Sequence, residues 1–170
     1  MTENGIVFIT AETSLVLGAS DSESGVKLVS YQVDDEAPSA YTRPLKIDRH
    51  GPHTIGYFAT DRVNNRESRK TLTVFVDNTP PLITLSYSVN PKMDAEKNMA
   101  VIPESALLYI EAKEMDTAID KITYSLNGEK TQLYRKPLSN FTPGETLTLK
   151  ISATDRLGNQ SEKEISFWVE

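Results

Sequence analysis

The chain contains an internal repeat, which limits its fold more than any other feature. ATDR occurs at residues 59–62 and again at 153–156, an offset of 94. Upstream, YTRPL at 41–45 lines up with YRKPL at 134–138 at an offset of 93. One extra residue enters the second copy within NFTPGET and is lost again after ATDR. A register held this closely within 170 residues predicts two copies of one folding unit.

Both copies show the two-residue periodicity of β-strands. In TLTLKISATD, at 146–155, apolar and polar side chains alternate, and Ile55, Tyr57 and Ala59 repeat the pattern in the first copy. No segment carries an apolar stripe with the helical period. Short alternating strands of this kind predict an all-β protein, made of two tandem immunoglobulin-like antiparallel β-sandwiches. The same alternation recurs at 29–33 and 122–126, and at 15–19 and 108–112.

Turn residues separate the predicted strands and the two repeats. Asn127-Gly128 is a preferred pair for a two-residue hairpin turn, because both central residues of that turn need positive φ. DNTPP at 77–81 ends one predicted strand and begins the next, and neither proline can donate to a sheet ladder. We therefore place the first repeat at residues 1–78 and the second at 79–170.

The first copy is shorter than the second at its start. Fourteen residues precede Leu15, whereas the 27 residues at 81–107 precede its counterpart Leu108 and include a clear strand, PLITLSYS. We expect the first copy to lack the counterpart of this opening strand. The chain is then either a piece of a longer array or a natural terminal domain that borrows or dispenses with the strand.

Composition excludes several classes of function. The net charge of −6 is spread along the chain without a basic stripe, so we expect no nucleic-acid partner. No apolar run is long enough for a membrane helix, so we expect no membrane insertion. The absence of cysteine excludes disulfides, thiolate metal sites and cysteine nucleophiles. Without a Gly-x-Ser-x-Gly motif for a nucleophile, we expect no enzyme, although paired carboxylates for glycoside chemistry stay open among 24 acidic residues.

The order of motifs resembles a known family. The run SGV, Y-x-(V/L)-(D/N)-(D/G), Y-x-x-P-L, Y-x-A-T-D-R-x-x-N and V-D-N-T-P-P is similar to tandem bacterial immunoglobulin-like repeats of large surface and secreted proteins, including leptospiral-type outer-membrane-associated repeats. The resemblance covers nearly all of both copies. It implies an exported protein at the cell surface, in the periplasm or secreted. The function it implies is a non-catalytic spacer or adhesion module, with neighbouring domains and a host or cell-surface protein or glycan as partners.

The recurring aspartate has two interpretations. Asp61 and Asp155 each stand where a strand ends and a turn begins, so the carboxylate can accept N–H groups of its own turn. Alternatively, the first repeat resembles the end of a cadherin-type repeat, in which Asp61, Asp77 and Asn78 would bind Ca²⁺ between neighbours. Asp21 and Glu23 would supply further oxygens, unless they lie at the opposite end of the sandwich. A calcium-stiffened adhesin is therefore one alternative function.

Aromatic side chains suggest a second alternative. If Val74 and Val76 point inward, Phe75 points outward, with Phe58 outward on the neighbouring strand and Trp168 in place of Phe75 in the second copy. An exposed aromatic face could stack on sugar rings, as in a carbohydrate-binding accessory module of a secreted hydrolase. The competing interpretation is a set of cross-strand pairs covered by their neighbours.

The two histidines suggest no chemistry. His50 and His53 flank a Gly-Pro turn, and two imidazoles without a third ligand make a poor zinc site. We expect them to lie on a solvent-exposed turn.

Overall fold

The computed structural model describes residues 2–3, 5–96 and 98–170. Within these residues every regular element is a β-strand and no helix occurs, which confirms the all-β prediction. The chain divides into two compact units, Met1–Asn78 and Thr79–Glu170.

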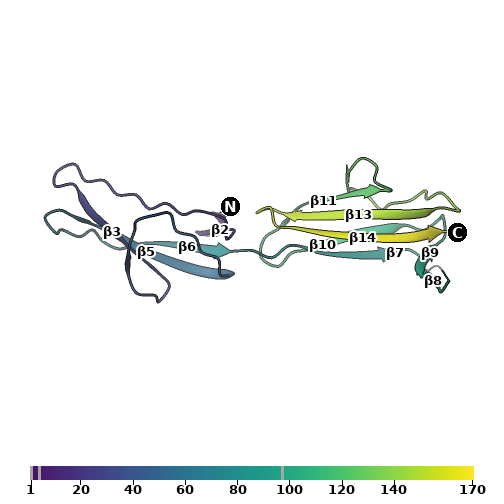
Figure 1. The fold of residues 1–170 in the computed structure, drawn as a ribbon, viewed down its shortest axis with the longest axis horizontal. Coiled ribbons are helices and arrows are strands. Elements are labelled where there is room, and N and C mark those ends of the chain that lie inside the picture. The colour runs from purple at the N-terminus through teal and green to yellow at the C-terminus, as the bar shows by residue number, and fades with distance from the viewer. Residues whose placement is uncertain (1, 4, 97) are drawn as a thin grey trace. The chain divides into compact units, whose positions relative to one another are not determined.

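Within its described residues, the first unit is built on one sheet. Its described strands are β1 (Thr2–Glu3), β2 (Ile6–Ile9), β3 (Val26–Val33), β4 (Ser39–Ala40), β5 (Gly51–Asp61) and β6 (Lys70–Val76). They pair in the order β1-β2-β6-β5-β3-β4, and β3, β5 and β6 are the long strands of this unit in Figure 1. The alternation predicted for β5 is confirmed at Ile55, whose apolar side chain is fully buried.

The part of the second unit that the structure describes has two sheets. Its described strands are β7 (Leu82–Tyr87), β8 (Lys92–Asp94), β9 (Met99–Ile102), β10 (Leu108–Lys113), β11 (Ile119–Leu126), β12 (Gln132–Leu133), β13 (Thr146–Asp155) and β14 (Gln160–Val169). The larger sheet has the order β12-β11-β13-β14-β9-β8, and β10 pairs with β7 alone. In Figure 1, β7 and β10 run alongside the long β13 and β14 strands.

The two larger sheets repeat one another strand for strand. Read from the opposite edge, β8-β9-β14-β13-β11-β12 matches β1-β2-β6-β5-β3-β4. Even the irregularity recurs, because the β3–β5 pairing shifts register between Val26 and Leu28 and the β11–β13 pairing shifts between Ile119 and Lys121. The sequence repeat is therefore a repeat of sheet architecture.

One strand pair in each six-stranded sheet differs from the prediction. β2 runs parallel to β6, with Val7 opposite Val74, and β9 runs parallel to β14, with Ala100 opposite Phe167. The prediction of wholly antiparallel sheets is therefore wrong for these two pairs. A parallel pair needs a long connection between its strands, and here the strands β3 to β5 and β10 to β13 provide it.

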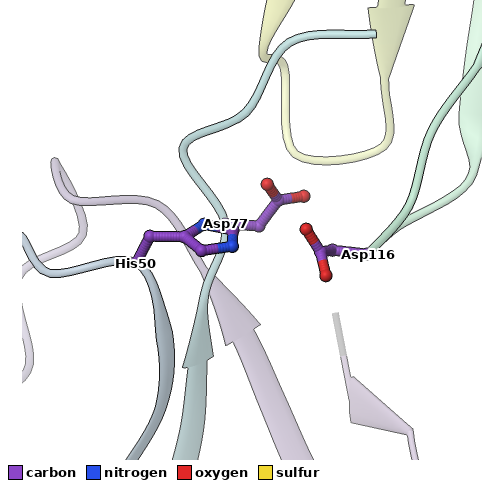
Figure 2. Close-up of side chains that lie close together, drawn as sticks. All are labelled: His50, Asp77 and Asp116. Carbon is purple, nitrogen blue, oxygen red and sulfur yellow. The ribbon is translucent and has the colours of Figure 1, made fainter.

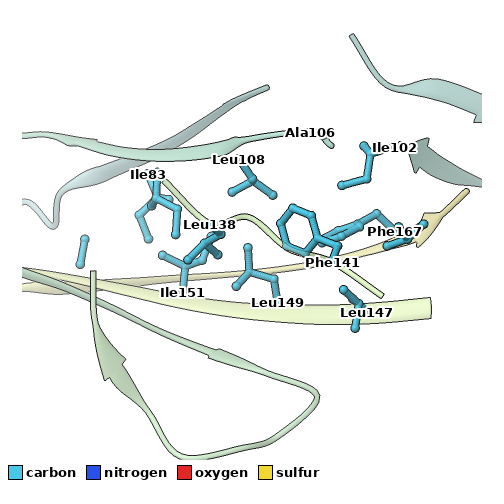
Figure 3. Packing of buried hydrophobic residues seen from close by; sticks show 13 residues of the cluster. Ile83, Ile102, Ala106, Leu108, Leu138, Phe141, Leu147, Leu149, Ile151 and Phe167 are labelled. Atoms are coloured by element: carbon cyan, nitrogen blue, oxygen red, sulfur yellow. The ribbon is translucent and has the colours of Figure 1, made fainter. Parts of the chain in front are cut away.

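The core of the second unit lies between its two sheets (Figure 3). Thirteen buried residues form this cluster, whereas the corresponding cluster of the first unit contains seven among the described residues. Both β7 and β10 contribute to the larger cluster. Its members include Ile83, Leu108, Ile110, Phe141, Leu147, Leu149, Ile151 and Phe167.

A strand predicted in the first unit is not formed. Alternation predicted a strand at 15–19, the counterpart of β10, but this segment makes only an isolated bridge from Leu15 to Leu45. The described part of the first unit also has no second sheet, so the sandwich predicted there is incomplete. The physical reason is the absence of a β7-like partner, because a strand is stabilised by its ladder rather than by its own alternation.

Candidate functional site

The repeated aspartate closes a turn in the second unit. Asp155 ends β13, and its Oδ1 atom accepts the N–H groups of Leu157 and Asn159 at 2.8 and 2.9 Å. Its Oδ2 atom accepts the side-chain amide of Asn159 at 2.9 Å and the hydroxyl of Thr117 at 3.2 Å. The side chain is only 1% exposed. This geometry agrees with the turn-closing interpretation.

Asp61 makes the same arrangement at the end of β5. Its two carboxylate oxygens accept from the N–H groups of Val63 and Asn65, the amide of Asn65 and the hydroxyl of Ser24, all at 2.8–2.9 Å. Burial by itself raises the pKa of Asp61, but the hydrogen bonds from Ser24, Asn65 and Val63 outweigh it, so the pKa lies below its ordinary value of 3.8. Donors of the protein therefore already occupy both oxygens.

Asp21 and Glu23 lie beside Asp61. The calcium hypothesis required this, because these two residues were to supply additional oxygen ligands. All three border an open groove of about 790 Å³. The Oδ1 atom of Asp21, however, accepts three N–H groups of its own loop, from Glu23, Ser24 and Gly25 at 2.8, 2.9 and 3.1 Å. Hydrogen bonds from Glu23, Gly25 and Ser24 hold the pKa of Asp21 below 3.8. Asp21 thus stabilises its loop in the way that Asp61 stabilises its turn.

Asp77 lies at the other end of the first unit from Asp61. It follows β6 directly, and Gly51, the first residue of β5, pairs with Val76. Asp61 is the last residue of the 11-residue β5, so the strand separates the two aspartates by about 30 Å. The predicted set of Asp61, Asp77 and Asn78 is therefore not brought together and cannot hold one ion.

Asn78 joins loops of the first unit. Its Oδ1 atom accepts the N–H of Ala11 at 2.8 Å, and its Nδ2 atom donates to the carbonyl of Asp48 at 2.9 Å. The N–H of the neighbouring Asp77 donates to the carbonyl of Ile9 at 2.9 Å. The DN pair thus fastens the end of β6 to the end of β2.

The two histidines have different environments. His50 lies just before β5, and Figure 2 shows its side chain near that of Asp77; Asp116, also labelled there, belongs to the loop between β10 and β11 of the second unit. His53 lies within β5 and is only 3% exposed. The prediction that both histidines lie on an exposed turn is wrong for His53, because β5 already begins at Gly51.

His53 is the centre of a polar cluster that the sequence analysis missed. Its Nδ1 lies 2.7 Å from Oδ2 of Asp34, and its Nε2 lies 2.7 Å from the carbonyl oxygen of Arg49. Both partners are acceptors, so both contacts are hydrogen bonds only when the ring carries two protons. Arg49 also contacts Asp34 at 2.8 Å, and Asp34 accepts the N–H of Thr54 at 2.8 Å. The signal in the sequence was a polar residue at the position where the second copy has the buried Leu147.

The aromatic residues proposed as a face do not form one in the first unit. Phe75 pairs across the sheet with Phe8 of β2, at 5.5 Å between ring centroids, and His50 contacts its ring at 5.6 Å. On β5, Phe75 lies opposite Pro52, six residues from Phe58. The guanidinium of Arg66 covers the Phe58 ring at 3.4 Å from its centroid. Phe58 and Phe75 are separate, half-buried sites.

Trp168 lies near the end of β14 in the second unit. It is half-buried between Val101 of β9 and Thr146 of β13. With Met93, which is 69% exposed, it borders an open pocket of about 270 Å³. Trp168 therefore has an exposed apolar neighbour, Met93.

The repeated strand order and the absence of helix in the described residues define an all-β protein of immunoglobulin-like type. The model of the bacterial Ig-like domain (group 3) family matches residues 39–169, and the chain belongs to that family. Domains of this family typically occur in extracellular or surface proteins. A comparison with curated proteins gives no match.

Two solved structures are similar to the chain at low identity. The first contains fibronectin(III)-like modules of CbhA from Clostridium thermocellum, with 12% identity over 98% of this chain and 90% of that chain and a TM-score of 0.43. The second is Drosophila N-cadherin EC1-3, with 14% identity over 97% of this chain and 63% of that chain and a TM-score of 0.34. Both TM-scores are too low for these likenesses to bear on function. None of the described residues forms a helix long and apolar enough to cross a membrane.

Proposed function

We propose that the chain is a non-catalytic pair of tandem Ig-like repeats that acts as a spacer or adhesion module of a larger exported bacterial protein. The motifs quoted above resemble those of tandem bacterial Ig-like repeats, including the leptospiral outer-membrane-associated type, and this resemblance supports the proposal. Its partners are neighbouring Ig-like domains of its own chain and a protein or glycan at a cell surface.

The observation that carries this proposal is the repeated sheet order of the two units. A six-stranded sheet used twice in the same strand order, with the same aspartate-closed turn, is suited to setting a distance, because each copy adds a similar length. Two prolines, Pro80 and Pro81, stand between β6 and β7, and each restricts a φ angle there. The conspicuous acids Asp61 and Asp155 are engaged in structural hydrogen bonds, which argues against a catalytic role for them.

The carbohydrate-binding alternative depends on Trp168. Phe58 is covered by Arg66, and Phe75 is flanked by Phe8 and His50, so neither presents a free ring face for stacking on a sugar. Binding of the chain to a panel of bacterial and host polysaccharides, repeated with Trp168→Ala, tests this alternative. Binding that disappears with Trp168→Ala would favour a carbohydrate-binding module over a spacer.

The spacer function can be tested by display on a bacterial cell. The chain is inserted between a surface anchor and an epitope, and antibody access to the epitope is measured by flow cytometry. The matched control is a Gly/Ser linker of equal residue number, which behaves as a flexible coil. The proposal predicts better antibody access with the folded chain. Equal access with both inserts would contradict it.

A further inference from the structure

Two exposed arginines lie on the face of the first-unit sheet that points away from its core. Successive side chains of a strand point to opposite faces. The buried Ile55 of β5 therefore faces the core, whereas Gly56 and Phe58 face the opposite side. The guanidinium groups of Arg66 and Arg69 lie over these two residues. Among the residues that the structure describes, neither guanidinium has an ion pair or a hydrogen bond.

Arg66 is held in place by an aromatic ring. Its guanidinium carbon lies 3.4 Å from the centroid of the Phe58 ring, in a cation–π contact. The N–H donors of a guanidinium lie in its plane, so stacking on a ring leaves them free. Arg66 is therefore oriented on the sheet while its donors stay available to a ligand.

Arg69 is held in place by a glycine. Its guanidinium occupies the position that a Cβ atom would take at Gly56. Glycine weakens the interior of a strand and often marks a close approach of another group. The φ angle of Gly56 is not in the left-handed region, so the backbone conformation does not require glycine there. The space that Gly56 leaves for Arg69 accounts for it.

The two guanidinium groups have a defined spacing and uncharged neighbours. They lie over residues two apart on one strand, a separation of about 7 Å along β5. Across the ladders, Phe58 lies opposite Ser30, and Gly56 lies opposite Gln32 on one side and Thr71 on the other. The adjacent positions on this face therefore supply polar side chains and no carboxylate.

The second unit does not repeat this arrangement. The counterparts of Phe58, Gly56 and Arg69 are Ser152, Lys150 and Glu162. Lys150 pairs with Glu164 of the neighbouring strand at 3.2 Å. The same face of the same sheet thus forms in the second unit without a pair of unpartnered cations, so the fold alone does not require the two arginines.

We propose that this surface, the arginine face (Gly56, Phe58, Arg66 and Arg69), binds an extended acidic peptide segment of a partner protein, with Asp or Glu at alternate positions. Carboxylates two residues apart on an extended peptide point to the same side and lie about 7 Å apart, which matches the two guanidinium groups. The planar guanidinium is suited to bidentate contact with a carboxylate.

A peptide fits this face better than an acidic glycan does. Arg66 covers the Phe58 ring, so the face offers no free aromatic surface for stacking on a sugar. The proposal rests on the adhesion function proposed above, because it specifies the chemistry of the partner. The spacer function does not depend on it, since the display experiment does not involve the arginine face.

Fluorescence anisotropy with a labelled acidic peptide tests the proposal. The probe is an eight-residue peptide of four Glu-Thr repeats, titrated with the full chain. We expect saturable binding that weakens with salt. Arg66→Gln and Arg69→Gln should each weaken binding about fivefold, because an exposed ion pair contributes up to roughly that factor. Both residues are exposed, so the melting temperature of either variant should stay close to that of the unmodified chain.

Matched controls separate a defined site from general attraction between charges. Gly56→Val keeps both arginines but fills the position of the Arg69 guanidinium, so it should weaken binding as Arg69→Gln does, while valine suits a strand. Arg62→Gln removes the same charge outside the arginine face and should leave binding nearly unchanged. A peptide of the same composition, with the order Glu-Glu-Thr-Thr repeated twice, should bind more weakly, because its carboxylates on one side lie about 14 Å apart.

Several outcomes would overturn the proposal. Absence of peptide binding, equal binding of the two peptides, or equal losses with Arg62→Gln and Arg69→Gln would each do so. Tighter binding of polygalacturonate than of the alternating peptide, lost in Arg69→Gln, would assign the face to an acidic glycan instead. A dimer in sedimentation that Arg69→Gln dissociates would assign it to a second copy of the chain. Each of these results leaves the spacer function to be decided by the display experiment.

Discussion

Asp155 offers the most direct test of how each repeat is held together. Asp155→Ala removes the acceptor of two backbone N–H groups, one amide and one hydroxyl. The site is buried, so the two N–H groups are left without water. Since a hydrogen bond contributes about 1 kcal/mol, and about 1.5–3 kcal/mol when one partner is charged, we expect a loss of about 3–4 kcal/mol in the unfolding free energy of the second unit.

Asp155→Asn is the matched variant. Its amide oxygen can still accept from Leu157 and Asn159, but its amide nitrogen replaces the oxygen that faces Thr117 and the Asn159 side chain. About half of the interactions are kept, so we expect a loss of about 1.5–2 kcal/mol. The ratio of the losses in unfolding free energy for the two variants therefore tests which hydrogen bonds Asp155 makes, and not only whether a buried acid is present.

The assay is urea unfolding followed by tryptophan fluorescence. Trp168 is the single tryptophan of the chain and lies in β14, so its emission reports on the second unit. Asp61→Ala is the control, because it alters the corresponding turn of the other unit and should leave this transition in place. A loss below about 1 kcal/mol for Asp155→Ala, or an equal loss for both variants, would refute the reasoning.

Three further predictions follow from single contacts. The pKa of Asp34 is held below 3.8, first by the N–H of Thr54 and then by His53, so its stabilising effect is present above about pH 4 and is lost as the pH falls through the lowered value. Melting curves of Asp34→Asn and the unmodified chain should accordingly differ most near neutral pH and converge in acid; a difference independent of pH would contradict this. Tyr134→Phe removes the acceptor of the Ile110 N–H, at 3.0 Å, and should cost about 1 kcal/mol in the same fluorescence assay, while an unchanged midpoint would contradict it. Melting in EDTA and then in millimolar Ca²⁺ should give one temperature, because Asp61 is occupied by protein donors; a shift that Asp77→Ala abolishes would instead support the calcium-stiffened adhesin.

Local features were predictable from the sequence. The Asn127-Gly128 pair has positive φ at both residues, 48° and 73°, as the hairpin rule requires. The turn after Asp155 could be predicted because its main acceptor and donors lie within four residues of one another. Where partner and residue are neighbours in the chain, composition and spacing carry enough information.

Non-local features were not predictable in the same way. The strand predicted at 15–19 fails because the ladder that would stabilise it comes from another segment, which periodicity does not reveal. The parallel pairing of β2 with β6 joins segments that lie far apart in the sequence, near the start and the end of the first unit. The alternation of apolar and polar residues is the same in parallel and antiparallel strands, so it does not reveal this pairing. His53 was placed on a surface turn because its partner Asp34 is 19 residues away in the sequence.

The parallel strand pair of the first unit has a mechanical consequence. The short strand β2 lies near the start of the unit and β6 is its last described strand, and Val7–Ile9 lie beside Val74–Val76 in the same direction. If tension is applied between residues 6 and 76, the two strands are drawn in opposite directions along their axes. All the hydrogen bonds between them then bear the load in shear together, instead of opening one after another as in a zipper. The unit is thereby arranged to resist stretching along the chain.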